Sequence, residues 1–521
     1  MRRLSALGGT VFAATANGRQ GTATMQAQVQ TSGSSQSQPG WSGTFRGYDP
    51  GPFYCEMLRS AERSAAIARV AGRLDALPLA TLRARAGDAE TELYNLGITF
   101  TVYSEKDAID RILPFDLIPR ILTRGDWATI ERGVIQRVQT LNLFLHDIYH
   151  DQKCIKDGII PGDLVLGNPN YRKEMEGLDL PFGTYIHING TDLVRGRDGT
   201  MMVLEDNARS PSGVSYVVEN RHLMLRAFAD LMENVPIMKV SDYGQRLHDR
   251  LCEVASPAIE EPQVVLLSPG VFNSAYFEHV FLAREMGVPL VEGRDLFVDD
   301  DRVFMKTIAG PMPVDVIYRR INDDFIDPEA FNPESMLGVK GLMRAYAKGN
   351  VQLANAPGTG VADDKAIYAY VPRLVRYYLD QDAILPNVET LICREKPALQ
   401  QVLERLGEMV VKPVGESGGY GITIGPKASK AELDDQRAKL LADPANFIAQ
   451  PMIDLSVSPT LTEDGIEPRH VDLRPFAVTG RSTWVLPGGL SRVALRKGSL
   501  VVNSSQGGGS KDTWVLREDV A

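Results

Sequence analysis

Asp192, Glu205 and Asn207 are the residues of this sequence whose types and spacing most directly suggest chemistry. Carboxylate and amide oxygens are hard ligands of the kind that Mg²⁺ takes in proteins, often together with the phosphates of a bound nucleotide. Such an ion would also offset the repulsion between two carboxylates on neighbouring strands. The alternative interpretation is an exposed acidic face neutralised by arginines such as Arg195 and Arg197, and this stretch alone favours neither.

A β-hairpin has to bring these three side chains together. Apolar-rich segments flank Asp198-Gly199, and Asp-Gly in that context is a strong hairpin signal. A two-residue turn there predicts two cross-strand pairs, Val194 with Val203 and Asp192 with Glu205. Because strand side chains alternate with period two, Asn207 is then expected on the face of Glu205.

Two glycine-rich stretches further along the chain each carry a lysine. Lys412 lies in a predicted strand, and Lys365 follows the sequence PGTG at 357–360. The loop after Lys412 contains four glycines, Gly415, Gly418, Gly419 and Gly421. They would let the loop close its backbone N–H groups over phosphates. No Gly-Lys-Ser/Thr opens a helix, so this is not the P-loop pattern. The two lysines together suggest a nucleotide held between two lobes.

Three further side chains have types suited to a nucleotide site. Gln450 ends the predicted strand FIAQ and is placed to face an adenine edge. Asp472 and Arg474 alternate along the predicted strand HVDLRPF, the first suited to metal or ribose and the second to phosphate or a reacting carboxylate. Taken singly, each of these residues, like each lysine, is best interpreted as a surface salt-bridge residue.

Composition places the chain among ordinary globular proteins and excludes several classes. With 521 residues, 44% hydrophobic and 23% charged, it is long enough for about two to four compact units. The net charge of −10 argues against nucleic-acid and membrane partners, and no apolar run approaches the ~20 residues that span a bilayer. Four scattered cysteines favour a reduced, cytoplasmic setting. His146 and His150 have no zincin Glu between them, so we expect both to pack within a helix.

Patterning divides the chain into four parts without an internal repeat. Residues 1–45, rich in Gln, Ser, Gly and Thr after a short apolar stretch, are expected to be a disordered extension. The parts that follow are a helical lead-in with the hairpin (46–255), an open α/β lobe (256–345) and a lid with the C-terminal strands (346–521). The order strand, helix, strand from Val264 to Val291 predicts the α/β lobe, whose first loop, 268–274, lies where such sheets bind ligands.

Three local patterns give sharper predictions. Leu79–Ala86 is expected to form a helix that stops at Gly87, and Val371–Leu379 a helix with Pro372 in its first turn. Asp300-Asp301 is expected to turn a second hairpin.

Long motifs between about Tyr48 and Leu516 carry a resemblance to a known family. They read LEDNARSPSGVSYVVENR, LLSPGVFNSAYFEH, VEGRDLFV, IYRRINDDF, NAPGTGVADDK, VVKPVGESGGYG, HVDLRPF and VVNSSQGGGSKDTWVL. The chain resembles the circularly permuted ATP-grasp family, in the type 2 group related to glutathionylspermidine synthase-like proteins. The resemblance implies a circularly permuted ATP-grasp fold of the α/β class, with an open α/β substrate lobe and a glycine-rich lid lobe.

The resemblance also implies roles for the residues singled out above. Asp192, Glu205 and Asn207 match the family's Mg²⁺ ligands, Lys365 and Lys412 its nucleotide lysines, and 415–421 its lid. Groups expected near the γ-phosphate or the acyl substrate are Arg209, Ser210 and Ser212. Candidate carboxylate clamps are Arg319, Arg320 and Arg474, and candidate substrate contacts are Asn273, Ser274 and Tyr276; an interlobe structural role is as well supported for these. The segment 507–511 is expected to form an anion-binding loop, the alternative being a flexible tail.

The activity that the resemblance implies is ATP-dependent ligation of a carboxylate to an amine, with two Mg²⁺ ions. The carboxylate would be phosphorylated by ATP and the amine would attack the acyl-phosphate. Phosphoryl transfer without ligation, and a nucleotide-binding partner protein without turnover, are the alternatives. Members of this family are often encoded with a helical alpha-E protein and a transglutaminase-like protein, which are therefore expected partners.

Overall fold

The computed structural model describes residues 41–61, 64–103, 108–415, 421–499, 502 and 508–518. The first 40 residues, Gly418 and Gly419 of the predicted lid loop, and Gly507 of the predicted anion-binding loop lie outside this part. Within it, no helix is both long enough and apolar enough to cross a membrane.

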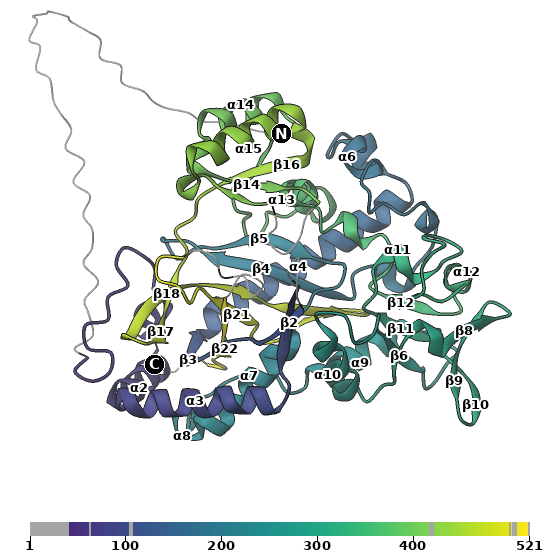
Figure 1. The fold of residues 1–521 in the computed structure, drawn as a ribbon. Helices are drawn as coiled ribbons and strands as arrows, with labels where there is room; N and C mark the ends of the chain where they lie inside the picture. The colour runs from purple at the N-terminus through teal and green to yellow at the C-terminus, as the bar shows by residue number, and fades with distance from the viewer. Residues whose placement is uncertain are drawn as a thin grey trace, which may run out of the picture. The chain divides into compact units, whose positions relative to one another are not determined.

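A nine-stranded sheet is the largest sheet of the described residues (Figure 1). Its main order is β20-β19-β4-β18-β21-β22-β3, while β5 pairs with β4 and β17 pairs with β18. All its pairs are antiparallel except β22 with β3. The strands are β3 Phe115–Leu122, β4 Ile188–Arg195, β5 Met201–Asn207, β17 Val457–Thr462, β18 Gly465–Arg474, β19 Phe476–Thr479, β20 Thr483–Val485, β21 Leu490–Val493 and β22 Gly509–Val515.

Helices cover both faces of this sheet because its strands alternate apolar side chains between the two faces. The 26-residue helix α4 (Arg124–Tyr149) packs Trp127 and Val134 in one apolar cluster with Leu473 and Ala477. On the other face, α7 (Val214–Ala227) shares a cluster with Phe476, Val478 and Leu490. β4 is buried along all eight residues, so any polar side chain on it needs an internal partner.

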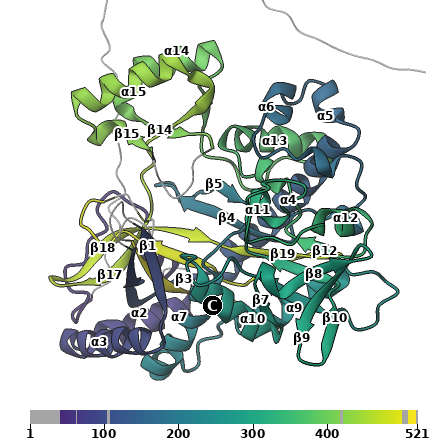
Figure 2. The same cartoon turned by 45° about the vertical axis from the view of Figure 1, so that its right-hand side comes forward.

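A separate four-stranded parallel sheet confirms the predicted open α/β lobe (Figure 2). Its order is β12-β11-β6-β7, with β6 Val264–Leu267, β7 Leu290–Val291, β11 Val316–Arg319 and β12 Gln352–Ala354. Helices α9 (Tyr243–Glu253) and α10 (Tyr276–Met286) pack against it. The hairpin of β8 (Leu296–Asp299) and β9 (Arg302–Thr307) turns at Asp300-Asp301 as predicted, and β10 (Gly310–Pro313) extends it.

The lid is a small α+β unit with an apolar cluster of its own. Its antiparallel sheet has the order β13-β16-β14-β15, with β13 Leu391–Ile392, β14 Met409–Pro413, β15 Thr423–Ile424 and β16 Phe447–Pro451. Helices α14 (Lys396–Glu404) and α15 (Lys430–Ala442) contribute Val402 and Leu440 to the cluster that also contains Met409 and Val411. Lys412 and Val410 therefore project from the opposite face of this sheet.

The remaining elements surround these three sheets. The helices are α1 Glu56–Ala61, α2 Ala65–Ala76, α3 Leu79–Asn95, α5 Lys153–Lys156, α6 Gly162–Leu166, α8 Ala229–Met232, α11 Asp323–Ile326, α12 Leu342–Ala347 and α13 Lys365–Leu379. A two-stranded hairpin joins β1 Thr99–Tyr103 and β2 Ala108–Ile112.

Two predicted helix ends are wrong. Helix α3 continues through Gly87 to Asn95, because burial of Leu93 and of other apolar residues outweighs the cost of about 1 kcal/mol for one helical glycine. Helix α13 begins at Lys365, six residues before the predicted start, and holds Pro372 in its interior.

Two predictions near the chain ends also need correction. The folded part includes Trp41 and Phe45, which pack in an apolar cluster, so the boundary at residue 45 is too late. Lys511 does not lie in a loop: it belongs to β22, is fully buried, and donates to the carbonyls of Ile118 (3.1 Å) and Pro459 (2.8 Å) beside Asp116.

Candidate nucleotide and metal site

The hairpin of β4 and β5 brings the three predicted oxygen ligands together. Asp192 lies opposite Glu205, as predicted, and Gly190 lies opposite Asn207. The Asn207 Nδ2 donates to the carbonyl of Gly190 (3.1 Å) and to Asp192 Oδ1 (3.3 Å). Among the described residues, the amide oxygen of Asn207 and the carboxylate of Glu205 accept no hydrogen bond on this patch.

The turn of this hairpin differs from the predicted one. Arg195 pairs with Met201 across a five-residue loop, so Val194 faces Met202 and its predicted pairing with Val203 is wrong. The Asp198 carboxylate accepts from the N–H and hydroxyl of Thr200, which favours the longer loop over a two-residue turn. A β-bulge at residue 204 then adds one residue to β5 and restores the opposition of Asp192 and Glu205.

Asp192 has both carboxylate oxygens in arginine ion pairs. Arg474 contacts it through two nitrogens, with Nη2 at 2.9 Å from Oδ2, and Arg492 Nη2 lies at 2.5 Å from the same oxygen. Burial alone would raise the pKa of Asp192, but the two guanidinium groups hold it well below its ordinary value. Asp192 is thus fully compensated by protein groups, and its role as a metal ligand stays a prediction.

Glu205 has a different environment, although it faces Asp192 across the hairpin. No hydrogen bond or ion pair joins its carboxylate to any residue in the part of the chain that the structure describes. Burial raises the pKa of the Glu205 carboxyl, and the negative Asp192 raises it further; Lys365 and Lys412 act in the opposite direction over a longer range. The cluster therefore holds a carboxylate that lacks a contact partner.

Lys412 and Gln450 reach the same region from the lid. In the lid sheet Val410 lies opposite Gln450 and Lys412 opposite Ile448, so the two polar side chains share the face that α14 and α15 leave uncovered. Lys412 is 9% exposed, and burial lowers its pKa, while Glu205 raises it and Lys365 lowers it. The structure thus brings both predicted lysines to Glu205.

A hollow of about 320 Å³ lies between α13 and residues 383–390, which lead into the lid. Ala369 and Pro372 of α13 form one wall, on the helix face that also carries Lys365. Thr390 lines it as well, and its hydroxyl accepts a hydrogen bond from Gln450 Nε2 (2.9 Å). Its lining is mainly apolar, with Asn387, Glu389 and Thr390 as the polar residues.

Asp472 is placed in the protein interior. Arg492 lies opposite it on β21 and its Nε is 3.0 Å from both carboxylate oxygens of Asp472. Burial raises the pKa of Asp472, and the guanidinium of Arg492 opposes that effect. The same Arg492 contacts Asp192, so one arginine that the sequence analysis missed joins two predicted site residues.

The loop after β5 carries the predicted acyl-site residues and is held from the α/β lobe. Arg209 pairs through Nε with Asp363 (2.6 Å), and the Ser212 hydroxyl accepts from Arg320 Nη2 (2.6 Å). Arg320 also pairs with Glu278 of α10 (3.1 Å), whose second oxygen accepts the N–H groups of residues 213 and 215. Arg320 is therefore occupied by internal contacts rather than presented as a carboxylate clamp.

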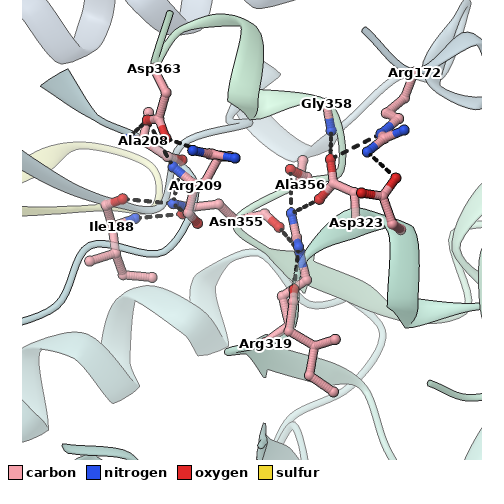
Figure 3. A network of polar contacts seen from close by, with 12 residues as sticks. Arg172, Ile188, Ala208, Arg209, Arg319, Asp323, Asn355, Ala356, Gly358 and Asp363 are labelled. Atoms are coloured by element: carbon pink, nitrogen blue, oxygen red, sulfur yellow. Dashed lines mark hydrogen bonds and ion pairs between the residues drawn. The ribbon is translucent and has the colours of Figure 1, made fainter. Parts of the chain in front are cut away.

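Asn355 fixes both ends of the hairpin, as Figure 3 shows. Its Oδ1 accepts from the N–H groups of His187 and Ile188 (2.7 Å each), and its Nδ2 donates to the carbonyls of Ile188, Ala208 and Arg209 (2.7, 2.8 and 3.1 Å). Nothing in its local sequence indicated this role beyond its place in the motif NAPGTG. A single side chain that directly follows β12 thus sets the path of the chain on either side of the predicted ligands.

Arg319 lies in the same network (Figure 3) and serves the interior too. Its Nε donates to the carbonyl of Asn355 (2.6 Å), and its Nη2 pairs with Asp323 (2.6 Å). Asn273 accepts from the N–H of Ala275 (2.9 Å), which shapes the loop before α10. These contacts give Arg319 and Asn273 structural roles.

Comparison with known proteins agrees with this geometry. The family described as circularly permuted ATP-grasp type 2 matches residues 119–494, which is most of the chain. The chain belongs to this family. The order of the site agrees with the permuted arrangement, because the hairpin precedes the lid in this ATP-grasp protein.

The similarity to individual relatives covers more of the chain than residues 119–494. An uncharacterized protein of Synechocystis sp. is 50% identical over 472 residues, which cover 90% of this chain and 98% of the relative. A protein of Frankia alni named "Putative glutamate–cysteine ligase 2-3" is 45% identical over 440 residues, covering 84% of this chain and 50% of its own length. A solved glutathione synthetase-like effector from Globodera pallida shares the fold, with a TM-score of 0.53 at 11% identity over 83% of this chain and 96% of its own.

The residues at the hairpin fit the Mg²⁺ that ATP-grasp proteins typically use. Among the described residues no three His, Cys, Asp or Glu side chains are grouped to hold a metal by themselves. Mg²⁺ does not need such a group, since it is commonly bound by one or two protein ligands and completed by substrate phosphates and water. The Glu205 carboxylate and the Asn207 amide oxygen, neither of which has a partner among the residues that the structure describes, are a suitable pair of ligands.

Proposed function

We propose that this ATP-grasp protein is an ATP- and Mg²⁺-dependent carboxylate–amine ligase that forms an amide bond through an acyl-phosphate. The observation that carries the proposal is the convergence of Glu205 from the hairpin, Lys365 from the start of α13 and Lys412 from the lid. Among the described residues, neither the Glu205 carboxylate nor the Lys412 ammonium has a hydrogen bond or an ion pair, and Lys412 is buried while Glu205 is half-buried. Charged side chains that have no counter-ion in the protein are suited to binding a charged ligand.

Each element of the site has a role in this proposal. Lys365 and Lys412 would hold the nucleotide phosphates, and the loop from Gly415 to Gly421 would close over them. The cavity beside Thr390 would take the adenine, with Gln450 at its edge. Glu205 and Asn207 would hold Mg²⁺, which supplies charge stabilisation between the β- and γ-phosphates.

The acyl substrate would lie on the opposite side, toward the loop after β5. Arg209, Ser210, Ser212 and Arg474 surround that side in the proposal, with Asp192 keeping Arg474 in place through their ion pair. The substrate carboxylate would take the γ-phosphoryl group and release ADP; the amine would then displace phosphate, leaving an amide and a proton. No protein nucleophile is needed.

Two lines support ligation over simple phosphoryl transfer. The Frankia alni relative is named a putative glutamate–cysteine ligase, although this chain spans only half of its length. Arg474, whose Nη1 donates to the carbonyl of Ser212, would pair with an anionic second substrate in this proposal.

The test is release of ADP and phosphate from Mg²⁺-ATP, measured against a panel of carboxylates and amines. Glu205→Gln and Lys412→Met serve as site variants, and Arg197→Ala, an exposed change on the same hairpin, is the matched control. Release that requires both a carboxylate and an amine, and that is lost in the site variants alone, supports the ligase. Release that requires only one acceptor identifies a phosphotransferase, and nucleotide binding without any turnover identifies a binding partner.

A further inference from the structure

The segment that connects α13 to the lid is bonded to the hairpin. This lid connector comprises residues 380–390. The N–H of Val203 in β5 donates to the carbonyl of Pro386 (2.8 Å), and the N–H of Val388 donates to the carbonyl of Val203 (2.9 Å). The contact lies beside the β-bulge that sets the position of Glu205. The lid connector is therefore bonded to the backbone of the β4–β5 hairpin at Val203.

Arg137 joins the side chains on either side of that point. It projects from α4, is 3% exposed, and donates through Nε to both oxygens of Asp206 (2.8 and 2.9 Å). Its Nη1 donates to Asn387 Oδ1 of the lid connector (2.8 Å). A guanidinium group fixes the angle between its donors, so the two contacts constrain each other.

Asp206 lies between Glu205 and Asn207 on β5. Because neighbouring strand residues project to opposite faces, Arg137 holds the hairpin from behind while the predicted ligands face the other way. A shift of Asp206 along the strand would carry Glu205 with it.

Tyr368 completes the arrangement on the side of α13. Its hydroxyl donates to the carbonyl of Val203 (2.6 Å), and its ring lies under the guanidinium of Arg137, 5.3 Å from ring centroid to Cζ. Pro372 has no N–H for the carbonyl of Tyr368, and Asn387 Nδ2 donates to that carbonyl instead (2.7 Å). The helix-interior proline thus creates the acceptor that anchors the lid connector.

We propose that Arg137 is a positioning residue that sets the lid lysine Lys412 against Glu205, with Asn387 as its contact on the lid side. The inference rests on the proposed function, because it concerns the same nucleotide. Arg137 itself touches neither the nucleotide nor the metal in this scheme. Its effect is to fix the position of the lid, which carries Lys412, relative to the β4–β5 hairpin, which carries Glu205.

The test is a double-mutant cycle on nucleotide affinity. Arg137→Lys keeps a charge for Asp206 but cannot hold both partners, and Asn387→Ala removes the contact on the lid side. Asp382→Ala is the matched control, since that side chain is 90% exposed in the same connector. Binding of Mg²⁺-ATP is measured by calorimetry, with melting temperature and hydrogen exchange of the Val388 N–H as readouts without ligand.

We expect each single variant to weaken Mg²⁺-ATP binding about tenfold, and the double variant to bind within about threefold of the weaker single one, because both break one linkage. Exchange at Val388 should be faster in both, while Asp382→Ala matches the wild type. Additive losses, or wild-type affinity in either single variant, would overturn the inference even if melting temperatures fall. Failure of the wild-type protein to bind Mg²⁺-ATP would instead count against the proposed function.

Discussion

Two groups of charged side chains meet on the β4–β5 hairpin and differ in how their charges are compensated. Asp192, Asp472, Arg474 and Arg492 form a buried network in which each carboxylate contacts a guanidinium group. Glu205, on the strand opposite Asp192, has no such contact among the described residues. The buried network behaves as scaffold, while Glu205 and the lysines near it are arranged for a ligand.

The difference shows that proximity in sequence motifs does not distinguish scaffold from ligand-binding groups. Asp192 and Glu205 carry the same charge on the same hairpin, and a pattern of residue types treats them alike. The arginines decide between them, because a carboxylate whose oxygens are both in ion pairs has little capacity left for another cation. The following four predictions test that contrast.

The largest expected effect is on the scaffold. Arg492→Met removes one of the partners of Asp192 and leaves the buried Asp472 carboxylate without its guanidinium contact. We expect the free energy of unfolding to fall by about 3–5 kcal/mol, as is found when one partner of a buried ion pair is removed. Urea denaturation measures it. A loss below about 1 kcal/mol would show that the network is not a scaffold.

The second prediction concerns Glu205. Glu205→Gln keeps the shape of the side chain but removes its charge, and we expect ADP release to fall about 10²–10³-fold, the scale reported for losing one preorganised electrostatic group. The unfolding free energy should not decrease, because the raised pKa of Glu205 indicates that its charge is held at a cost. Activity near the wild-type level would remove Glu205 from the site.

The third prediction uses pH to separate Lys412 from a structural lysine. Burial lowers its pKa below the ordinary 10.5, so the folded state disfavours the charged form. Without ligand, Lys412→Met should be at least as stable as the wild type at pH 7, and the advantage should shrink as pH rises through the lowered folded-state pKa and vanish above 10.5, where the lysine is neutral in both states. Affinity for Mg²⁺-ATP should fall about 10-fold or more, measured by calorimetry. A stability loss at pH 7 would place Lys412 with the scaffold.

The smallest expected effect is that of Ser212→Ala. The substitution removes the acceptor of Arg320 Nη2, which keeps its bond to Glu278, so we expect a stability loss of about 1–2 kcal/mol in urea denaturation. If Ser212 also contacts the acyl substrate, KM for the carboxylate should rise while the affinity for Mg²⁺-ATP stays unchanged. A rise in the nucleotide Kd would assign the loop to the nucleotide instead.

Local patterns in the sequence were sufficient for several parts of this protein. Alternation predicted that Asp192 and Glu205 lie on facing strands, although their opposition is reached through a five-residue loop and a bulge rather than the predicted two-residue turn, and glycine-flanked lysines predicted the two cations near Glu205. The order strand, helix, strand predicted the parallel sheet. These features depend on side-chain period and on turn residues within about thirty positions, which a sequence shows directly.

The tertiary structure alone decided which predicted residues are scaffold. The arginines that occupy Asp192 lie 282 and 300 positions away, and Asn355, which fixes both ends of the hairpin, lies up to 168 positions from its partners. The bulge at residue 204 was also missed, as was the interior position of Pro372 in α13, where Asn387 donates to the Tyr368 carbonyl in place of the missing proline N–H. Strand order in a sheet brings such partners together, and no local period or propensity encodes it.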